Sequence, residues 1–279
     1  MRERVSIASV RRFGSGASQP DQDLVAVESP LAIELIQLSS GIRRPLGVLM
    51  RTPGDDDELV AGLLHSEGIV RSAGDIIGMR HHPADASDSA SPDRVEVTLA
   101  QGIDLALVLI ERATAPTSAC GLCGRLAVES AGALAHAAIA SSGLRVRAAA
   151  IAGIPDALRR SQAVFAETGG LHAAGVFDTE GRLLASREDI GRHNAVDKLV
   201  GSLLQAGQLP ARERVLGVSG RAAFEIVQKA ALAGMAVIVA VGAPSSLAVE
   251  AARATNITLV GFARDGRFNV YSGTDRIAD

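Results

Sequence analysis

The chain has 279 residues, of which 47% are hydrophobic, enough for one large or two smaller folded units with buried cores. Its 28 basic and 31 acidic residues nearly cancel, so no overall positive field attracts nucleic acid or lipid headgroups. With no Trp and one Tyr, the chain also lacks the aromatic platform on which single-stranded nucleic acid stacks. We therefore expect no nucleic-acid partner.

The cellular compartment is predicted from the cysteines and the apolar pattern. The chain has two cysteines, which is typical of a reducing compartment. No signal-peptide core follows Met1, and no apolar run reaches the length of about 18 residues that a membrane helix needs. We expect a soluble cytoplasmic protein with no membrane partner.

The first 115 residues predict an arm followed by a strand-rich lobe. Residues 1–21 show no apolar periodicity and predict a mobile N-terminal arm. Residues 22–115 predict a small α+β lobe with strands at 23–28, 31–38, 47–51 and 95–99. A helix is expected at 56–66, because the carboxylates of Asp55, Asp56 and Asp57 suit the positive end of a helix dipole and can cap it. The segment 81–92 has the composition of a surface loop, and 103–111 predicts a short helix.

Residues 125–279 change to longer helices that alternate with short apolar strands. Helices are expected at 125–140, 155–166, 192–206, 221–233 and 246–254. Strands are expected at 171–178, 182–187, 214–218, 235–241, 257–262 and 268–271, the first two joined as a hairpin. This alternation predicts an α/β domain with a layered sheet.

Both cysteines lie in one short segment, 116–124, which predicts a mobile loop. Cys120 and Cys123 have a spacing that suits a redox disulfide, half of a metal site, or a persulfide carrier. A structural zinc site needs four ligands, and the chain has one thiol pair, so we expect no structural zinc. A zinc deaminase has His-x-Glu followed by Pro-Cys-x-x-Cys, whereas here Ala119 replaces the proline and His172 is followed by two alanines instead of the general acid/base Glu. A reactive thiol on a mobile loop suits delivery of sulfur better than a rigid dithiol switch.

Several predicted strands of the second domain end in glycine, serine and arginine. Such loops share one crevice at the carboxyl edge of a parallel sheet, where backbone N–H groups and helix N-termini bind phosphate. Each turn on its own also fits an ordinary capped helix. Neither a Walker loop nor a complete Gly-x-Gly-x-x-Gly motif occurs. The candidate anion-binding residues at these turns are Ser219, Gly220, Arg221, Ser245, Arg264 and Arg267.

Two further candidates start the helix predicted at 192–206. Arg192 and His193 fall in its first turn, where positive side chains oppose the helix dipole. That misfit indicates a binding site, although His193 and Asn194 also fit a structural role in which they bond to backbone groups. His172, in a predicted strand, fits a core histidine. Glu188 and Asp189, beside Arg187, fit a solvated charge cluster.

Taken together, these segments closely resemble the formate dehydrogenase accessory sulfurtransferase family (FdhD). The resemblance is carried by residues 51–56, 120–124, 167–174, 187–198, 219–221, 243–248 and 261–262. It implies that the second domain has a cytidine-deaminase-like three-layer fold without zinc chemistry. It also implies a cytoplasmic homodimer.

The resemblance further implies a function. The chain would accept sulfur from a cysteine desulfurase and pass it to the molybdenum (or tungsten) bis-molybdopterin guanine dinucleotide of formate dehydrogenase, with a guanine nucleotide as a mimic of that cofactor. The family's persulfide cysteine corresponds to Cys120, with Cys123 as its partner. The family's cofactor-binding stretch corresponds to Phe262, Ala263, Arg264, Asp265, Gly266 and Arg267, and His193 or Lys198 would orient the acceptor.

Two other functions stay open at this point. In a non-catalytic cofactor chaperone the thiols would only ligate or protect the metal. In a dithiol oxidoreductase Cys120 and Cys123 would form a reversible disulfide.

Overall fold

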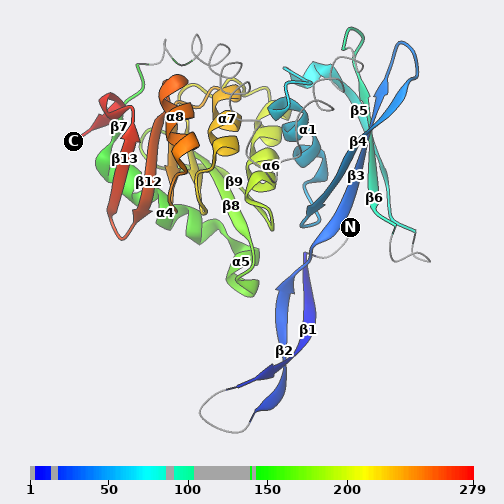
Figure 1. Ribbon diagram of the computed structural model, residues 1–279, viewed down its shortest axis with the longest axis horizontal. Coiled ribbons are helices and arrows are strands. Elements are labelled where there is room, and N and C mark those ends of the chain that lie inside the picture. The colour runs from blue at the N-terminus through cyan, green and yellow to red at the C-terminus, as the bar shows by residue number, and fades with distance from the viewer. Residues whose placement is uncertain (1–3, 14–17, 86–90, 104–138, 140–142) are drawn as a thin grey trace.

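The computed structural model describes residues 4–13, 18–85, 91–103, 139 and 143–279. They form two lobes side by side and a β-hairpin that projects away from both (Figure 1). The predicted cysteine loop at 116–124 lies outside the described residues. So do the predicted helices at 103–111 and 125–140, except for residues 103 and 139. Within the described residues, no helix combines the length and apolar character that a membrane span requires.

The first lobe is a four-stranded sheet with one long helix packed on it. Its strand order is β4-β3-β6-β5. Along β3, Leu31, Ile33 and Leu35 are buried while their neighbours are only partly buried, as expected for a strand with one face on a core. That core includes Leu59 and Leu64 of α1. The elements are β3 (Ser29–Gln37), β4 (Arg43–Arg51), α1 (Asp56–Ser66), η1 (Ala73–Asp75), β5 (Ile76–His82) and β6 (Asp93–Leu99).

The second lobe contains a six-stranded mixed sheet of order β13-β12-β11-β10-β8-β9. Strands β10, β11 and β12 are parallel, whereas β8, β9 and β13 join the sheet antiparallel to their neighbours. The predicted alternation of strands and helices and the β8–β9 hairpin are confirmed. The strands are β8 (His172–Phe177), β9 (Leu183–Asp189), β10 (Val215–Val218), β11 (Val237–Ala240), β12 (Thr258–Arg264) and β13 (Arg267–Ser272).

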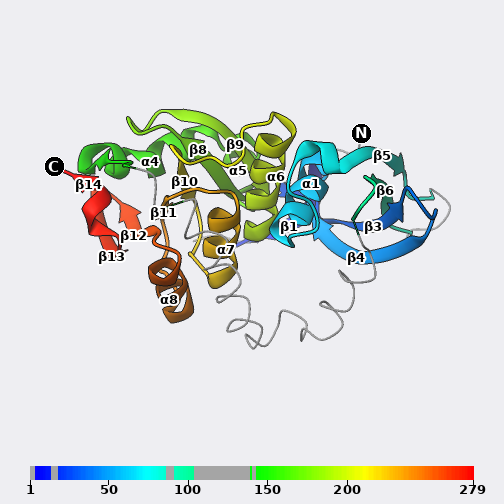
Figure 2. The same ribbon diagram turned by 90° about the horizontal axis from the view of Figure 1, so that it is seen from above.

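Helices cover the two faces of this sheet. Figure 2 shows α4 on one side and α7 and α8 on the other, with α6 between the sheet and the first lobe. The helices are α4 (Ala148–Ser161), α5 (Ala163–Thr168), α6 (Arg192–Gln205), α7 (Phe224–Leu232) and α8 (Ser246–Ala254). Short elements at the far edge are β7 (Val146–Arg147), η2 (Thr274–Arg276) and β14 (Ile277–Ala278).

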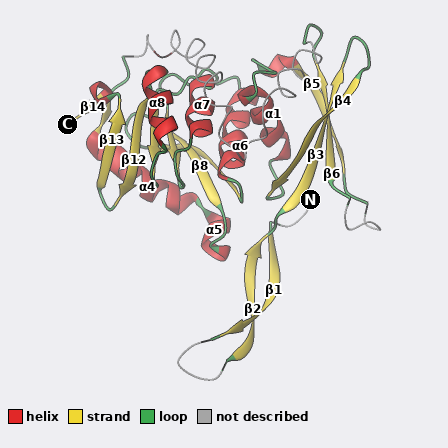
Figure 3. Cartoon of the chain, viewed as in Figure 1, coloured by secondary structure: helices red, strands yellow, loops and turns green. Residues whose placement is uncertain are grey.

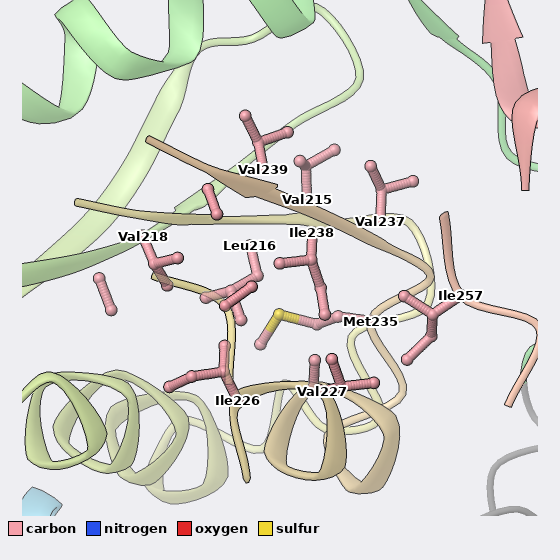
Figure 4. Close-up of a cluster of buried hydrophobic side chains, with 14 of the residues drawn as sticks. Val215, Leu216, Val218, Ile226, Val227, Met235, Val237, Ile238, Val239 and Ile257 are labelled. Atoms are coloured by element: carbon pink, nitrogen blue, oxygen red, sulfur yellow. The ribbon is translucent and has the colours of Figure 1, made fainter. Parts of the chain in front are cut away.

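Part of the core of the second lobe lies between the parallel strands and α7. Leu216 and Ile238 are completely buried there, and Figure 4 shows them on the side of the strands that faces Ile226 and Val227 of α7, whereas Val215, equally buried, lies on the opposite face. Short strands that are buried on both faces read as unbroken apolar runs, which is why the sequence located them well.

The N-terminal residues depart from the prediction. Instead of an irregular arm, β1 (Val5–Arg12) pairs antiparallel with β2 (Gln19–Ala26), and the resulting ribbon projects from the molecule (Figure 3). The boundary predicted at residue 21 falls inside β2. Both strands are mostly exposed, so neither carries the sustained apolar alternation that marks a half-buried strand.

Three local predictions also need correction. One helix was expected at 155–166, but α4 begins at Ala148, continues through Pro155 and is followed by a separate α5. The predicted loop at 81–92 starts later, because β5 extends to His82. The start of α1 is correct, yet Asp55 makes no side-chain cap, and Asp56 instead binds Arg51.

The two lobes meet where α1 crosses α6 at a pair of glycines. A Cβ atom added to Gly62 would lie 1.8 Å from the carbonyl oxygen of Asp197, and one added to Gly201 would lie 1.8 Å from that of Glu58. The two helix backbones are therefore in direct contact, and no larger residue fits at either position. Beside this crossing, Arg187 of β9 forms an ion pair with Glu58 of α1.

A buried polar network joins the lobes next to the same crossing. The Asp189 carboxylate accepts hydrogen bonds from the backbone N–H of Thr52 at 3.1 Å and from Asn194 Nδ2 at 2.9 Å. Lys198 Nζ lies 2.8 Å from Asp189 Oδ2 and donates to the Thr52 carbonyl at 2.8 Å. The side chains of Asp189 and Lys198 are completely buried. A second buried pair links Lys229 to Asp197 at 2.7 Å, so the chain's two lysines both lie in buried ion pairs.

The strand that leads into Thr52, β4, is itself held by a buried arginine. Arg51 binds both carboxylate oxygens of Asp56, at 3.0 and 2.9 Å, and Asp93 at 2.9 Å. Burial lowers the pKa of Arg51, but its hydrogen bonds to Asp56 and Asp93 outweigh burial and raise it overall. The guanidinium therefore stays charged and fixes the end of β4 against α1.

Replacing Lys198 by Met should strongly destabilise the protein. The Asp189 charge would stay buried without its ionic partner, which costs about 3–5 kcal/mol of unfolding free energy. Urea unfolding measures the loss, and Arg212→Met, at an exposed position, is the matched control. Adding Asp189→Asn to Lys198→Met removes the buried charge and should recover part of the loss. A Lys198→Met variant as stable as the control would show that the pair does not hold the lobes.

The glycine crossing yields a second prediction. Gly62→Ala should lower the unfolding free energy by about 3 kcal/mol, because the added methyl group forces the two helices apart. Gly153 of α4 is the control, since an added Cβ there meets nothing within 4 Å. Gly153→Ala should instead be neutral or gain up to about 1 kcal/mol from the higher helix propensity of alanine. Similar unfolding curves for the two variants would refute the tight crossing.

Candidate functional site

The sheet of the second lobe brings the predicted turns to one edge. Because β10, β11 and β12 are parallel, their carboxyl ends meet there, and β8, antiparallel to β10, starts at the same edge with His172. In the β8–β9 ladder His172 pairs with Asp189, so the start of α6 lies at this edge too. In Figure 1 the edge is at the bottom of the second lobe, near α5 and the turn between β12 and β13.

A cavity of about 430 Å³ opens at this edge between the strand ends and α4 and α5. Ser219, Val241, Arg264 and Asp265 line it from the ends of β10, β11 and β12. Its other walls come from α4, α5 and the start of β8, with Pro155, Asp156, Leu158, Arg159, Gln162, Phe165, Gly169, Gly170, Leu171 and His172. The structure thus brings three predicted residues, Ser219, Arg264 and Asp265, into one cavity.

Ser219 and His172 are held together where β10 ends. The Ser219 hydroxyl accepts a hydrogen bond from the backbone N–H of Ala173 at 2.9 Å, and the Ser219 N–H donates to the Ala173 carbonyl at 3.0 Å. Gly220 follows, and a Cβ there would lie 3.3 Å from His172 Nδ1. His172 is half-buried at the cavity wall, not in the core. Burial lowers its pKa, and the positive charge of Arg192 adds to the effect.

Arg192 and His193 form a strongly polar start of α6. Arg192 Nε and His193 Nε2 are buried and have no hydrogen-bond partner among the described residues. Burial, followed by the charge of Arg192, lowers the pKa of His193 to about 4, so His193 is neutral near pH 7. Its nearest carboxylate oxygen, on Glu225, is 3.7 Å away. Arg192 is thus a cation with a free donor next to the glycine turn after β10.

The stretch Phe262–Arg267 comprises the end of β12, the two-residue turn Asp265–Gly266 and the start of β13. Asp265 and Gly266 have φ angles of 53° and 70°, as in a type I′ hairpin turn. Phe262 also has a left-handed φ of 52° and is 39% exposed, a strained conformation for an aromatic residue that requires support from its surroundings. Its N–H donates to the Gly242 carbonyl at 3.1 Å. Ala263 is completely buried, so its side chain does not face a ligand.

The other predicted residues have different positions. The Ser245 hydroxyl accepts a hydrogen bond from the Ala248 N–H at 3.2 Å and caps α8, which is the ordinary structural role. Arg221 and Arg267 are exposed and do not line the cavity. Gly220 and Gly242 allow the turns after β10 and β11 to touch, since the Gly242 N–H donates to the Gly220 carbonyl at 2.9 Å.

Two expected roles at this edge change. Lys198 is completely buried in its ion pair with Asp189. Its ammonium group therefore does not face a sulfur-accepting ligand. Glu188 and Asp189 are not a solvated cluster, because both are buried. The Glu188 carboxylate accepts hydrogen bonds from the N–H groups of Val164 and Phe165, at 3.1 and 2.9 Å, and so anchors the start of α5.

Sequence reasoning missed the wall of the cavity formed by α4 and α5. Asp156, Arg159, Gln162 and Phe165 lie in a segment with no motif, and only the fold shows that they face the strand ends. His172 was noticed, but as a core residue. The expected nucleophiles Cys120 and Cys123 lie outside the described residues. Within the described part of the chain, no cluster of three His, Cys, Asp or Glu side chains is arranged to hold a metal ion.

The side chains and turns at this edge suit a large anionic ligand that contains a planar ring. Glycine turns expose backbone, while Arg264 and the free donor of Arg192 supply positive charge for phosphate. The cavity beside them is large enough for part of a nucleotide and has both aromatic and polar walls.

Comparison with known proteins agrees with this architecture. The model of the FdhD/NarQ family matches residues 26–278. Proteins named sulfur carrier protein FdhD are similar in sequence. That of Streptomyces coelicolor is 45% identical over 271 residues, covering 96% of this chain and 94% of the relative. That of Thermoplasma acidophilum is 45% identical over 255 residues, covering 91% and 87%.

A solved structure is similar as well. The crystal structure of a protein from Desulfotalea psychrophila, described as a formate dehydrogenase accessory protein, aligns with a TM-score of 0.75 and 25% identity. The alignment covers 99% of this chain and all of the other. On the strength of the family match over most of its length, the chain belongs to the FdhD/NarQ family.

Proposed function

We propose that this protein is a sulfurtransferase that carries sulfur as a persulfide on Cys120. The names of its relatives, sulfur carrier protein FdhD, support a role in sulfur transfer. In the first step the Cys120 thiolate attacks the terminal sulfur of a persulfide on a cysteine desulfurase. The new S–S bond forms as the old one breaks, and the desulfurase leaves as a thiolate, so no external oxidant or reductant is needed.

The proposed acceptor of the sulfur is the molybdenum or tungsten bis-molybdopterin guanine dinucleotide, bound at the carboxyl edge of the six-stranded sheet in the second lobe. The observation that carries this proposal is the convergence of three strand ends, with Ser219, Arg264 and Asp265, on one cavity. Phosphate groups fit the glycine turns and the arginines, and Arg192 Nε is a buried donor without a partner among the described residues. The same turns are bordered by Phe262, Gly220 and Arg221. Ser245 acts indirectly, because it caps the start of α8.

The proposal also covers the partners of the protein, its oligomeric state and its cellular compartment. We take the desulfurase and formate dehydrogenase as successive partners, the chain as a homodimer, and the cytoplasm as its compartment. The similarity of the second lobe to the cytidine deaminase fold also stays a prediction.

The carrier cysteine can be tested directly. After incubation with a cysteine desulfurase and radiolabelled cysteine, the peptide that contains Cys120 should gain the mass of one sulfur and carry label that a thiol reductant removes. Cys120→Ala should lose the label and the ability to activate formate dehydrogenase. Cys123→Ala is the matched control and should still acquire label, because the attack needs only one thiolate.

The same mass spectrum separates the alternatives. A dithiol oxidoreductase would show the loss of two hydrogens, and a cofactor chaperone would show no change in mass. A Cys120→Ala variant that still acquires sulfur and activates the enzyme would refute the assignment.

A further inference from the structure

The two outer edges of the β1–β2 ribbon can be told apart by where their backbone groups point. In an antiparallel pair, alternate residues bond to the partner strand, and the residues between them direct their N–H and C=O groups outward. The Val27 N–H donates to the Arg4 carbonyl at 2.9 Å, and the next pair in the register is Val5 with Ala26. This register fixes which residues point outward. They are Val5, Ile7, Ser9 and Arg11 on β1 and Pro20, Gln22, Leu24 and Ala26 on β2.

The outer edge of β2 is closed to a further strand. Pro20 has no N–H to donate. The Gln22 N–H donates to its neighbour Asp21 at 2.8 Å. The Leu24 N–H donates in the same way to Asp23 at 3.0 Å. Proline and charged side chains are means by which proteins protect an edge strand from pairing, and here they occupy three of the four outward positions.

The outer edge of β1 has none of these protections. Ile7, Ser9 and Arg11 keep their N–H groups, and within the described part of the chain β1 pairs with β2 alone. The edge is also apolar or small in its first half, and Ile7 is 67% exposed. Arg12 forms an ion pair with Asp21 of its own ribbon, and Arg11 lies near the tip. An open edge of this kind is a template for another strand.

The base of the ribbon is held firmly. Arg4 Nη2 donates to Asp55 at 3.0 Å, and Arg4 Nε donates to the Pro53 carbonyl at 3.2 Å. On the other strand, α5 packs against β2, and a Cβ added to Gly170 would lie 3.5 Å from that of Ala26. Beyond this base the ribbon projects from the molecule (Figure 3). A two-stranded ribbon on its own is only marginally stable in water, so pairing with a further strand would stabilise the projecting part.

We propose that the outer edge of β1 pairs with β1 of a second copy of this chain, so that the two ribbons form one four-stranded sheet. A two-fold axis makes the two β1 strands antiparallel. The Arg11 side chains then lie at opposite ends of the pairing and do not oppose each other. The same operation on β2 would gather the carboxylates of Asp21 and Asp23 from both copies in one interface. The charge pattern therefore favours β1 as the strand that meets its own copy.

This inference rests on the proposed function in one respect, that the chain is a homodimer. It adds the surface through which two copies meet. The surface lies outside the crevice and outside residues 26–278, which the family model matches, except for the last residue of β2.

Analytical ultracentrifugation of the full chain tests the proposal. The wild type should sediment as a dimer. Ser9→Pro removes an outward N–H and leaves the bonds between β1 and β2 in place, so it should raise the dissociation constant of the dimer by about tenfold or more. Gln22→Pro is the matched control, because Gln22 lies opposite Ser9 and its N–H is already bound by Asp21. The control should remain as dimeric as the wild type.

Hydrogen exchange of the wild type gives a second readout that needs no substitution. At concentrations where the chain is dimeric, the peptide that contains β1 should exchange more slowly than after dilution, because its outward amides become bonded. The peptide that contains β2 should exchange equally at both concentrations. The proposal is overturned if exchange in β1 does not depend on concentration, or if the two proline variants dissociate to the same extent.

The outcomes also separate this interface from the proposed function. A dimer that Ser9→Pro leaves intact would overturn the β1 interface alone. A monomeric wild type would overturn both the interface and the homodimer. Neither result bears on the acquisition of sulfur by Cys120, which is measured on a different peptide.

Discussion

The buried carboxylate of Asp189 is the constraint on which the arrangement of the two lobes depends. It ends β9 and accepts a hydrogen bond from the backbone N–H of Thr52, the residue that follows β4 in the other lobe. Lys198 neutralises it and binds the Thr52 carbonyl in turn. A buried charge without a partner costs several kcal/mol, so this network tolerates only one relative position of the lobes. The close contact of α1 and α6 at Gly62 and Gly201 restricts the relative position of the lobes as well, because no bulkier residue fits there.

The same residue also places the candidate site. His172 is opposite Asp189 in the β8–β9 ladder, and the Gly191 N–H donates to Asp189 Oδ1 at 2.9 Å. The start of α6, with Arg192, is therefore held beside the turn after β10. On the other side, Glu188 holds α5 and with it the wall that contains Gln162. Two adjacent carboxylates at the end of one strand thus fix both sides of the crevice.

The crevice concentrates features that a structure without a ligand-binding role would avoid. Phe262 has a left-handed backbone, Arg192 Nε and Gln162 Nε2 are buried donors without partners among the described residues, and Arg192 opposes the dipole of its own helix. Each of these costs stability, whereas the rest of the sheet is well packed. Such costs are expected where a protein retains groups for a ligand.

The sequence predicted the elements whose pattern is local. Helix α1 was predicted with its observed bounds, and β10, β11 and β12 within a residue or two, because apolar runs and helix-start signals lie within the segments themselves. It also predicted that Ser219, Arg264 and Asp265 would meet, from the rule that parallel strands end at one edge.

Features that depend on distant partners were not predictable in this way. The β1–β2 ribbon has no buried face to produce a pattern. Lys198 looked like a ligand-binding residue because its carboxylate partner is visible only in the fold. Gln162 and Phe165 carry no motif, and α4 and α5 bring them to the crevice only through tertiary packing.

The central claim, that the crevice receives the acceptor of sulfur, is tested most directly by separating sulfur loading from delivery in an Arg264→Gln variant. The side chain of Arg264 lines the cavity and is exposed, so the fold should not change. The measurement compares persulfide label on the loop peptide with activation of formate dehydrogenase, using Arg160→Gln, on the exposed surface of α4, as control. The account predicts normal labelling with much weaker activation. Activation equal to that of the control would contradict it.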